Sequence, residues 1–210
     1  QARNIFRDSG QRFITCNIDV QHGSPEALAY ERLGTELGFG ARESRRAWRE
    51  ASRALEQRQK AEERAQKERA RQPGMKVLVA GHSYILSDPY LGKPILDILE
   101  KAGAVSLRAD ALEPGTARKA CAGFSPTCRW IVSEEIVGGV YLWKEKVDGI
   151  ILVSAFPCGP DSMTNELLIR RIRGIPILTL VLDTQSGMAG IETRLESFLD
   201  IIRFQKGETV

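Results

Sequence analysis

After Pro73 and Gly74, the chain repeats one pattern: a short run of β-branched and other apolar residues, then an amphipathic segment. Apolar runs of this length without polar alternation are typical of strands that are buried on both faces. Amphipathic helices between such strands indicate right-handed crossovers, which make the sheet parallel and cover both of its faces. We therefore predict an α/β domain with an open parallel sheet. Its strands are expected near residues 76–81, 104–109, 149–155 and 175–183, in the spatial order 2-1-3-4.

The segments between and after these strands carry the helix signals. Their apolar spacing predicts helices over residues 94–102, 129–144, 162–173 and 190–204. The stretch 119–129 contains Gly123 and Pro126, which disfavour helix interiors, so we expect a loop there. This loop would carry two of the four cysteines, Cys121 and Cys128.

The first 74 residues have a different character. Ser24 and Pro25 form a helix start signal, and Gly38 ends the helix that follows. Residues 43–72 contain neither glycine nor proline and are rich in good helix formers, which predicts one long charged helix. Upstream, a single strand without partners is indicated by Ile5, Phe6, Phe13 and Ile14.

These features predict a division of the chain at residue 74. Residues 1–74 are expected to be a strand, loop and helical segment left from a preceding domain, and residues 75–210 the α/β domain. The remaining domains of a longer chain are therefore expected partners.

Charge and hydropathy restrict the partners further. Residues 42–72 hold eleven lysines and arginines against six glutamates, but acids alternate with bases at i,i+4 spacing, as in Glu56 with Lys60. This is the usual pattern of a solvated helix, so we expect its stripe with Trp48 and Leu55 to pack and nucleic acid to bind only weakly. No apolar run approaches the ~20 residues of a membrane span, and no signal peptide is evident. We expect a cytoplasmic protein without membrane or nucleic-acid partners.

Polar residues follow the predicted strands at their carboxyl ends, where open parallel sheets bind ligands. The candidates for substrate binding at this edge are His82, Ser83, Asp161, Ser162 and Asp183. His82 is equally suited to a loop hydrogen bond, and Asp183 to capping its own loop. No glycine-rich dinucleotide motif or P-loop follows the first strand, which argues against a standard site of either kind.

Cys158 is the candidate site residue with the most reactive side chain. It lies between proline and glycine in a rigid turn beside a helix N-terminus, an environment that lowers the pKa of a thiol. A thiolate binds metal or attacks carbon, and the alternative is a small buried apolar residue. A Cys–His pair would need His82 or His22, and we rank that arrangement below metal binding. The six-residue gap between Cys121 and Cys128 fits neither a zinc knuckle nor a ferredoxin motif.

Several ordered blocks are similar to a known superfamily. Residues 147–154 and 156–162 resemble the "DGII…FxCGPDS" segment of proteins related to 2-hydroxyacyl-CoA dehydratases and benzoyl-CoA reductases. Within it, the chain resembles the acyl-CoA dehydratase activase-related proteins. Residues 175–198 resemble the "IP…L…D…AGxxTRxEAF" ending, and residues 81–89 the "G(R/H)PYxxxDP" loop. Departures are Ser83 in place of proline and the sequence that follows Asp183 in place of "EHT".

The resemblance implies a Rossmann-like domain that helps to clamp an iron–sulfur cluster of the 4Fe–4S type. Cys158 matches the cluster ligand of the family, and further ligands would come, by order along the chain, from Cys16 and from Cys121 or Cys128. The implied function is an iron–sulfur redox protein of anaerobic acyl-CoA metabolism.

Its implied partners are an ATP-dependent activator protein, which would supply electrons, and an acyl-CoA or related thioester. As an enzyme it would be a dehydratase-like lyase or reductase component. The alternative is a non-catalytic module without a cluster that binds a nucleotide or acyl-CoA or serves as a scaffold.

Overall fold

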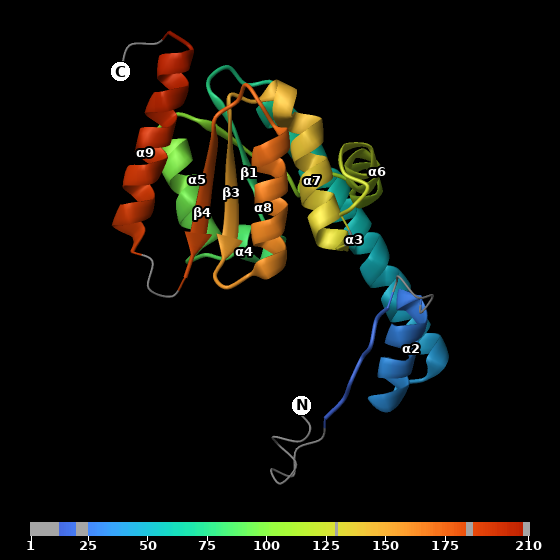
Figure 1. The fold of residues 1–210 in the computed structure, drawn as a ribbon. Helices are drawn as coiled ribbons and strands as arrows, with labels where there is room; N and C mark the ends of the chain where they lie inside the picture. The colour runs from blue at the N-terminus through green and yellow to red at the C-terminus, as the bar shows by residue number, and fades with distance from the viewer. Residues whose placement is uncertain (1–12, 20–24, 129, 184–186, 208–210) are drawn as a thin grey trace. The chain divides into compact units, whose positions relative to one another are not determined.

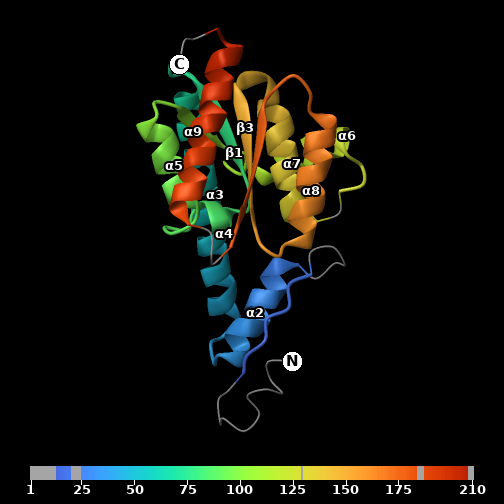
Figure 2. The ribbon, with the colours of Figure 1, turned by 60° about the vertical axis from the view of Figure 1, so that its left-hand side comes forward.

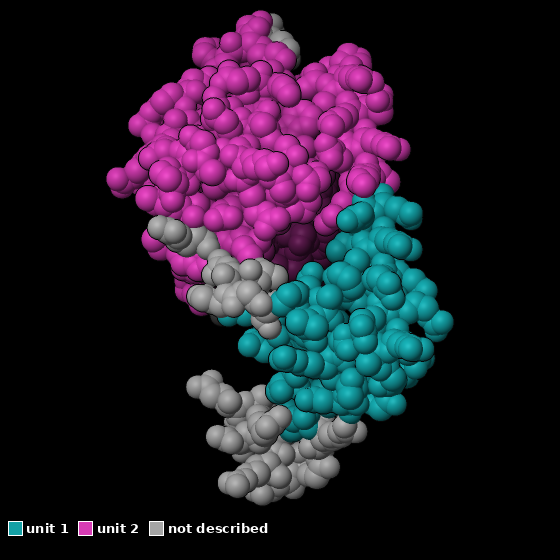
Figure 3. Space-filling view, turned by 90° about the vertical axis from the view of Figure 1, so that its right-hand side faces the viewer, with its two compact units in different colours: residues 1–58 teal, residues 59–210 magenta. Residues whose placement is uncertain are grey.

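The computed structural model describes residues 13–19, 25–128, 130–183 and 187–207. The contacts within the chain divide it into two compact units, residues 1–58 and 59–210, which Figure 3 shows in different colours.

The second unit is built around a four-stranded parallel sheet (Figure 1). The strands lie in the order β2-β1-β3-β4, and register pairs Val77 of β1 with Gly149 of β3 and Ile150 of β3 with Ile177 of β4. Both the parallel pairing and the predicted order 2-1-3-4 are confirmed, and the domain is Rossmann-like. The strands are β1 (Lys76–Ala80), β2 (Val105–Arg108), β3 (Gly149–Ala155) and β4 (Ile177–Leu182).

Helices cover both faces of this sheet (Figure 2). One face packs against α4 (Ser83–Leu86), α5 (Gly92–Lys101) and α9 (Met188–Gln205). The other packs against α7 (Ile131–Trp143) and α8 (Gly159–Arg171), and α6 (Pro114–Phe124) lies on α7. A short 3₁₀ helix, η1 (Lys144–Lys146), joins α7 to β3. The helices predicted near α5, α7, α8 and α9 are therefore present, with ends shifted by a few residues.

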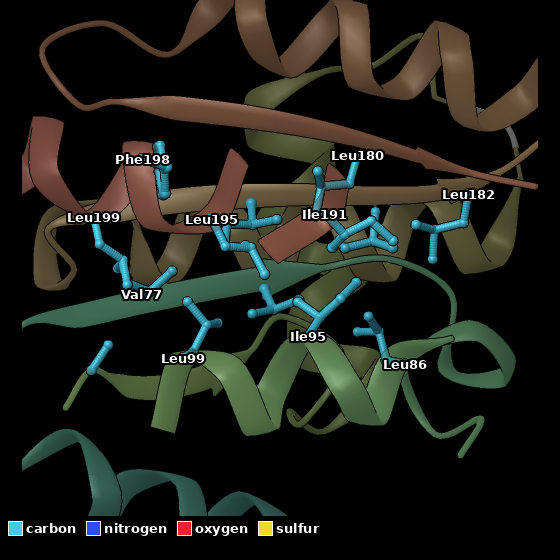
Figure 4. Close-up of a cluster of buried hydrophobic side chains, with 14 of the residues drawn as sticks. Val77, Leu86, Ile95, Leu99, Leu180, Leu182, Ile191, Leu195, Phe198 and Leu199 are labelled. Carbon is cyan, nitrogen blue, oxygen red and sulfur yellow. The ribbon is translucent and has the colours of Figure 1, made fainter. Parts of the chain in front are cut away.

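The alternation of side chains along the strands explains why the sequence runs are continuously apolar. Val77 and Val79 of β1 point into the core under α5 and α9, whereas Leu78 and Ala80 point into the core under α7 and α8. Figure 4 shows the first of these cores, where Leu195 of α9 lies near the strands. Each large aliphatic side chain buried in this way stabilises the fold by about 2 kcal/mol.

The predicted loop over residues 119–129 is wrong in its first half, because α6 continues to Phe124. The helix begins at Pro114, and the carboxylate of Glu113 accepts hydrogen bonds from the backbone N–H groups of Gly115 and Thr116. Gly123 lies one residue before the helix end, where glycine reduces helix stability only slightly. Cys121 is therefore a helical residue, and Cys128 lies in the loop that follows.

The long charged helix α3 (Ala41–Ala70) is present as predicted, and its second half packs in the second unit. There, the fully buried side chain of Gln66 donates to the carbonyl of Arg108 at 2.6 Å and accepts from its N–H at 2.7 Å. These are the bonds that a neighbouring strand would make with β2. Gln66 thus covers polar backbone on an edge strand of the sheet.

The first unit contains α2 (Glu26–Glu36) and the first half of α3. Gly38, with a φ of +94°, ends the first helix as predicted, while the predicted capping residue Ser24 lies outside the described residues. Phe13 and Ile14 are not in a strand, and Ile5 and Phe6 also lie outside the described residues.

An apolar cavity of about 480 Å³ lies between these two helical segments. Trp48 and Leu55 of the predicted stripe line it, together with Tyr30 and Leu37 from the α2 region, and Leu55 remains 56% exposed. The arginines and lysines of α3 are exposed, as expected. Among the described residues, no helix has both the length and the apolar character needed to cross a membrane.

Candidate functional site

Two loops at the carboxyl edge of the sheet form the candidate site. One follows β1 and carries His82 at the start of α4, and the other follows β3 and carries Cys158 at the start of α8. Because β1 and β3 are neighbours, these loops lie side by side. A Cβ atom on Gly81 would lie 2.6 Å from the carbonyl oxygen of Val153, so only glycine lets the first loop pass this close to β3.

The side chains of His82, Cys158 and Asp161 meet between the two loops. The Nε2 atom of His82 is 2.5 Å from Oδ1 of Asp161, although the two residues are 79 positions apart in the chain. The potential ligand atoms of all three side chains lie within 4.8 Å of one another. Nitrogen, sulfur and carboxylate oxygen together form a donor set that suits zinc or iron.

Asp161 is the most buried member of this group, with a side chain that is only 7% exposed. Its Oδ1 interacts with His82, but its Oδ2 is buried and has no hydrogen-bond partner among the described residues. A buried polar atom without a partner costs about 1–3 kcal/mol, and more when it is charged. The helix start alone does not account for this orientation, because a capping carboxylate would use its oxygens on backbone N–H groups.

Cys158 is partly exposed, and its backbone is fixed by the turn. Its N–H donates to the carbonyl of Ala155 at 2.9 Å, and its own carbonyl accepts from the hydroxyl of Ser162 at 2.9 Å. Burial raises the pKa of the Cys158 thiol, and the carboxylate of Asp161 raises it further. The backbone N–H of Asp161, at the helix N-terminus, does lower this pKa as expected, but burial and the Asp161 carboxylate outweigh it, so the pKa is raised overall. A bound cation would reverse the effect by deprotonating the thiol.

Tyr84 also lies close to these three residues, although it was not among the site residues predicted from the sequence. Its ring stacks on the His82 ring with 5.2 Å between centroids, and it is 62% exposed. Its pKa is raised by burial and by the charges of Asp161 and Cys158. The signal in the sequence was its place two residues after His82, which the structure puts in the first turn of α4.

The other candidates at this edge have less defined roles. Ser83 is the first residue of α4 and is exposed, and Asp183 is exposed directly after β4. The hydroxyl of Ser162 is used within the first turn of α8, on the carbonyl of Cys158. The residues that follow Asp183, up to position 186, lie outside the described part of the chain.

The remaining cysteines do not belong to the three-residue group. Cys121 is buried in the apolar core under α7, and burial raises its pKa to about 12, with Cys128 as the next contributor. Cys128 is partly buried beside it. Cys16 is exposed in the first unit, where its sulfur donates to the carbonyl of Ala29 at 3.7 Å.

Comparison with protein families matches residues 2–112 to the family described as "CoA enzyme activase uncharacterised domain". This match includes the first unit and the sheet as far as β2, so that it contains His82 but ends before Cys158 and Asp161. No curated protein and no solved structure matches the chain.

Proposed function

The chain belongs to the family of CoA enzyme activase domains, which relates it to the activators of acyl-CoA dehydratases, and we propose that it is an iron–sulfur redox component of such a system. The observation that carries this proposal is the juxtaposition of the Cys158 thiol with His82 and the incompletely paired Asp161 carboxylate. Cysteine thiolates are the principal ligands of iron–sulfur clusters.

The cysteines of this chain fit a cluster unequally. Cys158 fits, because its sulfur lies at an open sheet edge and a turn fixes its backbone. Cys121 does not fit, because it is buried among apolar side chains and strongly favours the protonated thiol. Of the other cysteines in the second unit, Cys128 is then the one that could supply a further thiol. A 4Fe–4S cluster at this edge would supply one-electron chemistry.

The side chains around Cys158 would perform the remaining tasks at this edge. Asp161 would hold the His82 ring through the 2.5 Å contact and fix its orientation. Ser83 and Asp183, both exposed, would contact the polar part of an acyl-CoA or related thioester. The ATP-dependent activator protein would deliver electrons to this edge.

This proposal is tested by electron delivery to the full chain. The protein is prepared without oxygen, supplied with iron and sulfide, and mixed with an ATP-dependent activator of an acyl-CoA dehydratase. We expect the visible absorption of the oxidised centre to decrease when MgATP is added. The absorption should not change with a non-hydrolysable analogue.

Two results would count against the proposal. A chain that binds no iron or sulfide under these conditions would favour the non-catalytic scaffold or ligand-binding module. If the chain binds iron and sulfide but its centre is never reduced in the presence of activator and MgATP, the activator is not its electron donor.

A further inference from the structure

We propose that Cys158, His82 and Asp161 also bind a single divalent transition-metal ion of the zinc class, without a thiol from any other part of the chain. The inference goes beyond the proposed function, because it requires neither a cluster nor an activator. It concerns the second unit alone, since all three residues belong to it.

The chemistry of the three side chains suits such an ion. Zinc binds cysteine sulfur at about 2.3 Å and histidine nitrogen or carboxylate oxygen at about 2.0–2.2 Å, most often with four ligands. Ligands on one tetrahedral ion lie roughly 3–4 Å apart by these bond lengths, and the three potential ligand atoms lie within 4.8 Å of one another. Binding of the ion would lengthen the 2.5 Å contact between His82 and Asp161 and shorten the longest of the three separations. A fourth position stays open to solvent or a ligand.

The second observation is independent of this spacing and concerns Asp161. Its side chain is more than nine-tenths buried, and its Oδ2 has no hydrogen-bond partner among the described residues. An ion pair with His82 would account for Oδ1 only. A cation between Asp161 and Cys158 would satisfy Oδ2 and would also stabilise the thiolate that burial otherwise disfavours.

The backbone holds the three ligands with little freedom. Cys158 and Asp161 are three residues apart at the start of α8, and His82 reaches them from the loop that Gly81 fits against β3. Metal sites require this kind of positioning, because the entropy of ordering the ligands then does not oppose binding.

The test is a titration of the full, reduced chain with Co²⁺, a spectroscopic substitute for Zn²⁺. We expect one Co²⁺ per chain, with a sulfur-to-cobalt charge-transfer absorption that Zn²⁺ removes by competition. Cys158→Ser should abolish this absorption. Asp161→Asn and His82→Asn should each weaken Co²⁺ binding by at least about 10–100-fold, the loss that supporting residues alone produce at metal sites.

Cys16→Ser is the matched control, because Cys16 is an exposed thiol outside the group. It should leave the absorption and the affinity unchanged. Circular dichroism checks that each variant is folded. If Asp161→Asn does not fold, His82→Asn decides the question, since His82 lies in a loop and is partly exposed.

The inference is overturned if wild-type protein shows no charge-transfer band, if the band persists in Cys158→Ser, or if folded Asp161→Asn and His82→Asn bind Co²⁺ like the wild type. Its failure is distinguishable from failure of the proposed function. A chain that binds Co²⁺ but never binds iron with sulfide supports the single-ion site and contradicts the cluster. A chain that binds iron with sulfide but no Co²⁺ supports the cluster and contradicts the single-ion site.

Discussion

Glu113 is the residue that starts α6, and it does so with an uncommon capping group. Its carboxylate accepts hydrogen bonds from the N–H groups of Gly115 and Thr116 at 2.9 and 2.6 Å, and from the Thr116 hydroxyl at 2.8 Å. These bonds lower the pKa of Glu113 below its ordinary value. The ionised side chain therefore stabilises the helix N-terminus.

Replacement of this cap gives a pH-dependent loss of stability. Because the pKa of Glu113 is lower in the folded than in the unfolded chain, its contribution is complete above the unfolded pKa and disappears as pH falls through the folded pKa. We expect Glu113→Ala to lower the free energy of unfolding by about 1 kcal/mol near neutral pH. The difference should shrink in acid, as measured by urea unfolding at several pH values. A difference that stays constant across the acid range would contradict this account.

Helix α7 approaches its neighbours so closely that two of its residues must lack a side chain. A Cβ atom on Gly138 would lie 1.7 Å from the carbonyl oxygen of Ala117 in α6, and one on Gly139 would lie 2.0 Å from that of Ala109 after β2. Both contacts are with backbone atoms, which cannot rotate away. The glycines therefore set the position of α7 against α6 and the sheet.

Gly138→Ala should destabilise the second unit despite the better helix propensity of alanine. Propensity favours alanine by about 1 kcal/mol, but the forced separation of two backbones should cost more, giving a net loss of about 1–3 kcal/mol. The control is Gly123→Ala in α6, where a Cβ atom meets nothing within 4 Å and stability should rise slightly. Thermal unfolding of both variants measures the difference. A Gly138→Ala variant as stable as Gly123→Ala would refute the close-packing argument.

The elements that could be predicted from the sequence are those with strong local signals. The strands are continuous apolar runs, and the segments that form α5, α7, α8 and α9 lie between or after them, with the clearest amphipathic period in α5. Helix α6 could not be predicted this way, because glutamate is not among the preferred capping residues and Gly123 with Pro126 indicated a loop.

The site was predictable as a set of converging loops but not as a set of contacts. The edge that carries His82, Cys158 and Asp161 follows from strand order alone. The 2.5 Å contact between His82 and Asp161 depends on how Gly81 passes β3, which no local pattern reveals. The direction of the Cys158 pKa also depends on burial and on Asp161, two features of the folded edge.

The family match covers nearly all of the first unit but only the first part of the second unit. The match extends from residue 2 to residue 112, through the first unit and the sheet as far as β2, whereas Cys158 and Asp161 lie on the later half of the sheet. The proposed redox centre therefore joins His82, from the matched region, to two residues beyond it. Its existence has to be tested on the full chain.

The most direct test is the iron and acid-labile sulfide content of the full chain after anaerobic reconstitution, for the wild type, Cys158→Ser and Cys121→Ala. We expect iron and sulfide in the wild type, a sharp loss of both in Cys158→Ser with the fold intact, and no loss in Cys121→Ala, because Cys121 is buried and protonated. Full iron and sulfide in Cys158→Ser, or none in the wild type, would contradict this expectation.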